Sequence, residues 1–320
     1  MKTKSELTDF YYKSLFPILE KLDGDRRQLR FKIILYLSSF TFIYIFSILL
    51  IINNIGPDFD VIIFGGFGYF AIISFIYKFL IKDYTAEFKD KIIKPLVGAI
   101  DSNLLYTSNS YVSEAIFNKS DLFSTSDRLS GNDHVKGKIN DIKIEFSDIH
   151  AEKKHKDSKG RTTWSTIFRG LFIVAEFNKH FAGKTLVLPD TAQSTFGDLI
   201  GGWLQANNFS QDELVRMDNT KFEKAFVVYS TNQIEARYIL SHTIMEKLLT
   251  FKKKSQQDIY ISFVGEDIHM AIYYNKDMFE PSVFKSLLEY KVAMEYVDTL
   301  HLALGIVEEL KLNQKLWSKR

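Results

Sequence analysis

Two segments in the middle of the chain combine residue types that could do chemistry, and the first is "SGNDHVKG" at 130–137. It places Asp133 and His134 among glycines, which would suit a catalytic turn or a phosphate-binding loop. Its spacing fits neither GxxxxGK[ST] nor GxGxxG, and it leads into a strand where both motifs lead into a helix. A turn that needs Gly131 and Gly137 for unusual backbone angles explains the segment equally well. Asp133 and His134 are therefore candidate ligand-binding residues with a structural alternative.

The second segment, "FRGLFIVAEFNKHFAGKT" at 168–185, joins a strand-like apolar run to a group of cationic side chains. Arginine and lysine suit phosphate and carboxylate groups. The candidate pocket for an anionic group consists of Arg169, Lys179, His180 and Lys184. The alternative, which we favour, is a core strand followed by an Asn/Gly turn with solvated charges at its end.

A third feature is the basic stretch "EKKHKDSKGR" at 152–161, in which five cationic residues face one Glu and one Asp. It contains a glycine and no bulky apolar residue, so we predict a loop at the tip of a β-hairpin. Near an anionic lipid surface each basic residue contributes about 1 kcal/mol of attraction. The candidate lipid-headgroup contacts are Lys153, Lys154, Lys156, Lys159 and Arg161. The alternative is an ordinary solvated loop.

Other catalytic or metal-binding patterns are weak. His242 and Glu246 are four residues apart on a predicted helix, but no HExxH-like pattern supplies further ligands, so we predict no metal site. The chain has no cysteine, which excludes thiolate sites and disulfides. No Ser/His/Asp arrangement or nucleotide motif is recognisable. We therefore expect no cofactor and favour a non-enzymatic protein, although catalytic groups can converge from distant segments.

Two apolar runs, 33–52 and 61–81, precede these segments. The first has twenty uncharged residues, of which fourteen are Ile, Leu or Phe, and as a helix it would span about 30 Å, the thickness of a bilayer core. The second carries one charge, Lys78, near its end, where the side chain can reach the headgroups. Neither run shows the polar stripe of a helix in a soluble protein. We predict two transmembrane helices.

The flanking charges predict the orientation of this pair. The loop at 53–60, "NNIGPDFD", contains no lysine or arginine. The basic residues stand outside it, at Lys21, Arg26, Arg27, Arg30 and Lys32 before the first run and Lys82, Lys89, Lys91 and Lys94 after the second. By the positive-inside bias both termini are cytoplasmic and the loop lies outside. Gly56-Pro57 predicts a tight turn, and Gly65, Gly66 and Gly68 predict close packing of the second helix on the first.

The rest of the chain predicts an α+β fold with a mainly antiparallel sheet and a long C-terminal helix. Alternation predicts strand structure over 134–152, followed by strands near 165–177, 184–190, 225–230, 258–264 and 268–274. Helical spacing predicts helices at 5–22, around 195–205, at 233–253 and from Pro281 onwards, with Asp23-Gly24 ending the first and Pro95 kinking a helix after the second span. The expected divisions are 1–30 (amphipathic helix), 31–81 (transmembrane hairpin), 82–120 (helical connector) and 121–320 (cytoplasmic domain).

Several stretches resemble DUF3137, a bacterial family of two-span membrane proteins of unknown function. The resemblance lies in "DRLSGNDHVKGKI" (127–139), "FRGLFIVAEFNKHFAGKTLVLPD" (168–190), "FEKAFVVYSTNQIEARYIL" (222–240) and "MFEPS…LALGIVEELKLNQKLW" (278–317). It implies a multi-pass protein of the bacterial inner membrane with a large cytoplasmic domain. It supplies no reaction, cofactor or catalytic residue, and it suggests association with LemA-type membrane proteins.

These observations lead to two function hypotheses. The first is a membrane-anchored module whose cytoplasmic domain binds another protein or assembles with itself. The second is an enzyme or sensor for a lipid-derived or small anionic ligand at the membrane surface. A channel or transporter ranks below both, because neither apolar run has an ionisable residue at its centre. With a formal net charge of +2 over 320 residues, we expect no nucleic-acid partner.

Overall fold

The computed structural model describes residues 3–56, 59–156, 159–177, 180–190, 214–274 and 277–309. The chain forms two compact units. One is helical and contains Ser5–Leu96 together with Glu280–Glu295. The other contains Met1–Lys4, Val97–Phe279 and Tyr296–Arg320 and is built on a β-sheet.

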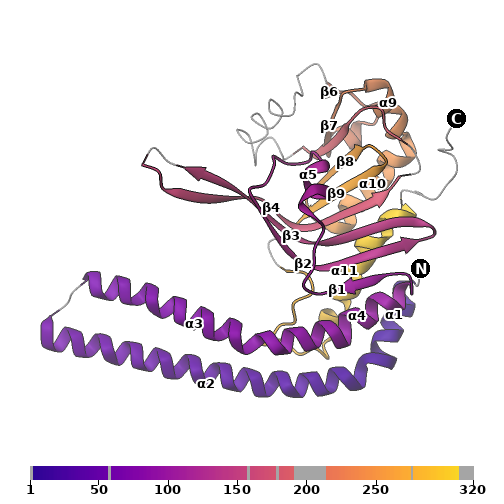
Figure 1. Cartoon of the computed structure of the whole chain (residues 1–320). Helices are drawn as coiled ribbons and strands as arrows, with labels where there is room; N and C mark the ends of the chain where they lie inside the picture. The colour runs from indigo at the N-terminus through magenta and orange to yellow at the C-terminus, as the bar shows by residue number, and fades with distance from the viewer. Residues whose placement is uncertain are drawn as a thin grey trace. The chain divides into compact units, whose positions relative to one another are not determined.

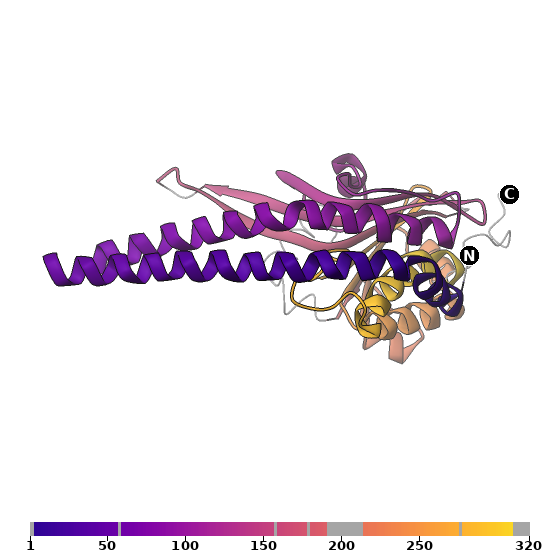
Figure 2. The same cartoon turned by 90° about the horizontal axis from the view of Figure 1, so that it is seen from below.

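The helical unit contains the two apolar runs as an antiparallel hairpin (Figures 1 and 2). Its elements are α1 (Lys4–Phe10), a π-helical turn (Tyr11–Leu15), α2 (Phe16–Ile55), α3 (Phe59–Phe88), a second π-helical turn (Lys89–Ile93) and α4 (Lys94–Ile100), whose last residues belong to the other unit. Tyr44 of α2 stacks on Tyr69 of α3 with ring centroids 4.6 Å apart. A Cβ added at Gly65 or Gly66 would lie within 4 Å of Tyr44, which confirms the predicted close packing at these two positions. At Gly68 the prediction was wrong, because a Cβ there would have no atom within 4 Å.

Two expectations for the helical unit were wrong. Asp23-Gly24 does not end a helix, because α2 runs without interruption from Phe16 to Ile55. The Asp23 side chain caps a different segment of the chain, and that tertiary contact outweighs the low helix propensity of glycine. The loop between the apolar runs is also shorter than 53–60, since helix extends to Ile55 and resumes at Phe59. Pro57 and Asp58 lie outside the described residues.

The sheet unit contains nine strands in the described part of the chain, and every neighbouring pair is antiparallel, in the order β1-β2-β3-β4-β9-β8-β5-β7-β6. The strands are β1 (Leu105–Thr107), β2 (Arg128–Ile139), β3 (Ile142–Lys156), β4 (Thr162–Glu176), β5 (Thr185–Pro189), β6 (Leu214–Val215), β7 (Phe226–Ser230), β8 (Ile259–Val264) and β9 (Asp267–Tyr273). The predicted α+β class, with an antiparallel sheet and a C-terminal helix, is confirmed.

The helices of this unit are α5 (Glu114–Lys119), α8 (Thr220–Glu223), α9 (Gln233–Ile239), α10 (His242–Ser255) and most of α11 (Tyr290–Glu309). α5 and α10 lie on opposite faces of the sheet (Figures 1 and 2). On the α5 face, Phe117 packs against Phe172 of β4 with ring centroids 5.2 Å apart. Because helices cover both faces of the sheet, the side chains of the central strands are buried on both faces.

Some predicted elements differ from those observed. The expected strand structure over 134–152 is a β2–β3 hairpin whose turn residues Asn140 and Asp141 have φ of 48° and 68°, as a two-residue hairpin turn requires. The helix predicted at 233–253 is broken between α9 and α10. The segment 82–120 is helical only to Ile100 and then contains β1 and α5. The helix expected around 195–205 lies outside the described residues.

The last helix begins at Tyr290, so Pro281 does not occupy its first turn as predicted. In the helical unit, Asp23 and Arg26 hold the segment before Tyr290 in bends and a turn by bonding Leu287 N and Val283 O. Pro95 behaves as expected for a helix-disrupting residue. The π-helical turn Lys89–Ile93 ends two residues before Pro95, and such a widened turn can accommodate the proline ring and the missing N–H.

Candidate functional site

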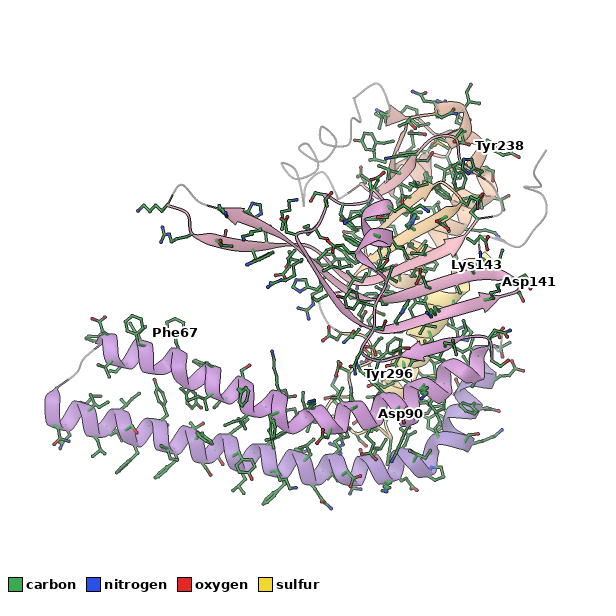
Figure 3. All side chains as sticks on the ribbon, in the orientation of Figure 1. Phe67, Asp90, Asp141, Lys143, Tyr238 and Tyr296 are labelled. Carbon is green, nitrogen blue, oxygen red and sulfur yellow. The ribbon has the colours of Figure 1, made fainter. Side chains whose placement is uncertain are left out.

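The helical hairpin exposes a large apolar surface. Helices α2 and α3 are long and apolar enough to cross a membrane by length and composition. Phe64, Phe67, Phe70 and Phe75 of α3 are each at least 70% exposed, and Phe67 points away from the hairpin (Figure 3). Water disfavours such a surface, which suits the hydrocarbon region of a bilayer. The hairpin therefore supports association with a membrane.

A cavity of about 800 Å³ opens on the α5 face of the sheet. The floor of the cavity is a row of residues on adjacent strands. In this row, β1 to β4 contribute one direct cross-strand neighbour each, namely Leu105, Lys136, Glu145 and Val174. Directly paired residues point to the same face of a sheet. We call this cavity the lysine groove, and its lining includes Leu105, Ile116, Lys119, Lys136, Lys138, Lys143, Glu145, Val174, Glu176, His180, Glu266 and Asp267.

The acidic residues of the lysine groove all have basic partners. Lys119 Nζ lies 2.7 Å from Asp267 Oδ2, and Lys143 Nζ lies 3.7 Å from Glu176 Oε1. His134 Nε2 lies 2.9 Å from Glu145 Oε2, and His180 Nδ1 lies 3.8 Å from Glu266 Oε1.

Two lysines of the groove remain outside these pairs. Lys136 and Lys138 are exposed on β2 and form no ion pair within the described ranges. Lys138 is directly opposite Lys143 on β3, which lies near the β2–β3 turn (Figure 3). Like charges in such a cross-strand position repel each other. Lys136 and Lys138 therefore present positive charge to the groove, while each of its acidic residues lies beside a lysine or a histidine.

The row of residues that forms the groove floor continues to a buried histidine. His269 of β9 pairs with Val174 and is fully buried, with Nδ1 3.4 Å from Ser262 Oγ. Its Nε2 has no hydrogen-bond partner among the described residues. Burial lowers the pKa of His269 to about 4; Asp267 raises it to a smaller extent, and Lys119 lowers it. The imidazole is therefore neutral at physiological pH.

We expect His269 to make the sheet unit less stable in mild acid. Its pKa in the folded chain is about 4, against an ordinary value of 6.5 for histidine, so as pH falls the unfolded chain binds the extra proton first. The free energy of unfolding is at its full value, as far as His269 is concerned, above pH 6.5. It decreases progressively as pH falls towards 4, by about 3 kcal/mol in total. Denaturant unfolding of wild type and His269→Leu between these pH values measures the difference. A pH dependence unchanged by His269→Leu would contradict this assignment.

Asp133 and His134 both have structural partners. Asp133 is buried with φ of 59° at a bulge in β2, where its carboxylate accepts a hydrogen bond from the Tyr106 hydroxyl. His134 pairs with Glu145 at the edge of the lysine groove. Gly131 and Gly137 do not adopt positive φ; a Cβ at either would overlap the backbone oxygen of a neighbouring segment. Glycine is therefore needed at these two positions because neighbouring backbone segments approach closely. The prediction that the glycines provide unusual backbone angles in a turn was wrong.

The predicted anionic pocket is divided between the two faces of the sheet. Arg169 pairs in register with His150, five residues from Glu145, so it faces away from the lysine groove. It lines a separate cavity of about 280 Å³ and lies 3.4 Å from Asp277. His180 lines the lysine groove, and Lys184 pairs with Asp121. Lys179 lies outside the described residues.

The basic stretch forms a two-stranded arm. Lys153–Lys156 of β3 pair only with Thr162–Ser165 of β4 in the described part of the chain, as Figure 1 shows. At its base, the Arg128 guanidinium lies 4.3 Å from the Trp164 ring centroid. Lys153 lies near Asp127, whereas Lys154, Lys156, Lys159 and Arg161 are exposed.

Helix α9 carries an apolar surface that the sequence analysis did not identify. Ile234 is 84% exposed and Tyr238 is 54% exposed, and four residues separate them on the helix. Tyr238 projects outward in Figure 3. Arg237 and Arg216 are exposed beside them, and Arg237 Nη2 lies 3.4 Å from the Arg216 carbonyl oxygen. We call these four residues the α9 surface. A helical wheel of 233–239 would have revealed the apolar pair.

No cluster of three or more potential metal ligands occurs among the residues that the structure describes. Glu246, one of the two helical residues at metal-ligand spacing, accepts a hydrogen bond from Asn219 Nδ2 at 2.8 Å. This contact gives Glu246 a structural role between α8 and α10.

Comparisons with known proteins give a family and one distant structural match. No curated protein matches the sequence. Among solved structures, the mycobacterial trehalose monomycolate transport factor A, TtfA, matches with 12% identity and a TM-score of 0.32, over 62% of this chain and 86% of that one. The model of DUF3137, described as a protein of unknown function, matches residues 166–312. This segment, which begins in β4 and extends past α11, is similar to the DUF3137 family.

Proposed function

We propose that this protein is a membrane-anchored interaction module of the bacterial inner membrane. Its helical hairpin crosses the bilayer, both termini lie in the cytoplasm, and the sheet unit binds another protein there. The orientation is supported by the basic residues that flank the two spans and the absence of lysine and arginine from the loop at 53–60.

The α9 surface carries the proposal that the partner is a protein. Tyrosine and arginine are enriched among the residues that contribute most to protein–protein binding. A side chain as apolar and exposed as Ile234 gains free energy when a partner covers it. Its position on a short helix with buried Ala236 and Ile239 beneath it gives it a rigid support.

The charges favour a different protein over a second copy of this chain. In a two-fold symmetric dimer formed through α9, Arg216 and Arg237 of one copy would lie near Arg216 and Arg237 of the other. The like charges would repel each other. Neither arginine forms an ion pair in the described ranges. We therefore propose a partner that presents an apolar depression rimmed by carboxylates. A LemA-type membrane protein is one candidate.

Single cysteines test both parts of the proposal, because the chain has none of its own. In intact spheroplasts, a membrane-impermeant maleimide should label Asn53→Cys, whereas Tyr238→Cys should react only after permeabilisation. In permeabilised native membranes, Tyr238→Cys should react more slowly than in the purified chain, because the partner covers it. Adding Arg216→Glu and Arg237→Glu should restore the fast reaction by repelling the acidic rim.

Lys253→Cys, on the exposed side of α10, is the matched control and should react equally in both preparations. Equal reactivity of Tyr238→Cys in both preparations would refute the interaction. Protection that appears in the purified chain at high concentration would instead identify a second copy as the partner. Labelling of Tyr238→Cys in intact spheroplasts would refute the cytoplasmic orientation.

A further inference from the structure

We propose that the lysine groove is a binding site for an amphipathic anion, with its acidic head at Lys136 and Lys138 and its apolar chain along Leu105, Ile116 and Val174. This proposal goes beyond the protein interaction proposed above, which uses the α9 surface. A volume of about 800 Å³ is within the range of small-molecule sites, about 300–1,000 Å³.

The apolar part of the groove supports an apolar ligand body. Leu105 of the edge strand β1 is 63% exposed, although its neighbour Tyr106 packs inward and bonds Asp133. Ile116 of α5 and Val174 of β4 line the same cavity. Val174 is already buried, whereas covering Leu105 and Ile116 removes apolar surface from water, which favours a ligand that carries an alkyl chain.

The charges fix the sign of the head group. Each acidic residue in the lining already has a lysine or histidine side chain beside it, so a cationic ligand would have to displace one of these contacts. Lys136 and Lys138 have no such partner among the described residues, and Lys138 stands opposite Lys143. A carboxylate or phosphate between these lysines would reduce their mutual repulsion. Lysine acts as a point charge and accepts either head group.

The rigid surroundings of the groove support a preformed site. Gly137 lies between the two lysines, and a Cβ there would overlap the Asn103 carbonyl oxygen, so the segment before β1 is packed tightly against β2. The Lys119–Asp267 pair joins α5 to β9 on the opposite wall. Because both walls are held by the sheet and by this pair, a ligand would lose little affinity to ordering the site.

Binding of radiolabelled octanoate tests the proposal. The full chain in nanodiscs of neutral phosphatidylcholine would be examined by equilibrium dialysis, with empty nanodiscs as the blank. The double variant Lys136→Ala/Lys138→Ala should bind at least about tenfold more weakly, because both charged contacts are lost. Lys136→Arg/Lys138→Arg should retain binding. Lys154→Ala/Lys156→Ala, which removes two exposed lysines from the arm, should match the wild type.

The length of the alkyl chain tests the apolar wall. Each methylene that becomes buried should tighten binding about fourfold, so hexanoate should bind more weakly than octanoate. Leu105→Ser should reduce this increment, and the exposure of Leu105 means that the variant should fold normally. Octyl phosphate should compete with octanoate, and octanol should not.

Nanodiscs that contain phosphatidylglycerol distinguish two sources of the ligand. Loss of octanoate binding in these discs would show that an anionic membrane lipid occupies the groove, and retained binding would show that a free amphiphile does; both support the site. Equal binding to wild type and Lys136→Ala/Lys138→Ala would overturn the proposal. Affinity independent of chain length, or binding no greater than that of empty nanodiscs, would also overturn it.

Discussion

Gly170→Ala is expected to disrupt the sheet unit and to lower its free energy of unfolding by about 4 kcal/mol. Gly170 lies in β4 between Ile149 of β3 and Tyr273 of β9, with φ of 149°. An added Cβ would overlap the Ile272 carbonyl oxygen and lie 2.6 Å from Tyr274 N. Both are backbone atoms that cannot rotate away, so backbone strain and overpacking, each about 1–3 kcal/mol, act together.

Thermal unfolding of the full chain, followed by hydrogen exchange of β4 and β9, measures this effect. Gly98→Ala is the matched control, because Gly98 lies in α4 with no atom within 4 Å of an added Cβ. Alanine is about 0.8–1.0 kcal/mol more favourable than glycine in a helix, so this variant should be slightly more stable. Unchanged melting and exchange in Gly170→Ala would show that β4 and β9 do not pair as described.

Asp23→Ala is expected to release the segment that precedes α11 within the helical unit. The buried Asp23 carboxylate accepts hydrogen bonds from Arg26 Nε at 2.8 Å, Ser286 Oγ at 2.8 Å and Leu287 N at 3.1 Å. Arg26 in turn donates to the Val283 carbonyl at 2.9 Å. Without the carboxylate, a buried guanidinium loses its counter-charge, which costs about 3–5 kcal/mol.

Hydrogen exchange at 282–289 in the full chain should increase strongly in Asp23→Ala. Asp9→Ala is the control, because Asp9 forms an exposed pair with Lys13 that contributes at most about 0.5 kcal/mol. Faster exchange in both variants, or in neither, would contradict a specific role for Asp23.

The pH dependence of the same exchange gives a second measurement on Asp23, which precedes the predicted spans. Burial opposes ionisation, but the hydrogen bonds from Arg26, Ser286 and Leu287 outweigh it, and the pKa of Asp23 lies below its usual value of 3.8. A carboxyl group with a lowered pKa stabilises the fold above the unfolded pKa. The segment should therefore stay protected at neutral pH and open only as pH falls through the folded-state pKa.

Local sequence was sufficient to predict those helices and strands whose residues all lie in the same kind of environment, such as an apolar surface or the core of the sheet. The two apolar runs need only length and composition to predict membrane-spanning helices, and α2 and α3 have both. Strand structure was likewise predicted at β3, where apolar residues mostly alternate with polar ones, and at β4, β7, β8 and β9, which are short apolar runs.

Local sequence failed where a distant contact overrides local preference. Asp23-Gly24 continues a helix, and the segment after Pro281 stays non-helical up to Tyr290, because residues more than 250 positions apart bond each other within the helical unit. The Asn140-Asp141 turn carried a local signal, since apolar residues at Ile139 and Ile142 interrupt the alternation by one position. This interruption marks the turn between β2 and β3, which are antiparallel.

The sequence by itself thus determined the apolar helical hairpin, the fold class and the similarity to DUF3137, because periodicity, composition and motif are properties of contiguous residues. Only the tertiary structure decided which charged residues share a surface. Arg169 and His180 are near in sequence but lie on opposite faces of the sheet, while Lys136 meets Leu105 and Val174 from strands far apart in the chain. Strand order and register create these neighbours, and both depend on non-local pairing that one segment cannot encode.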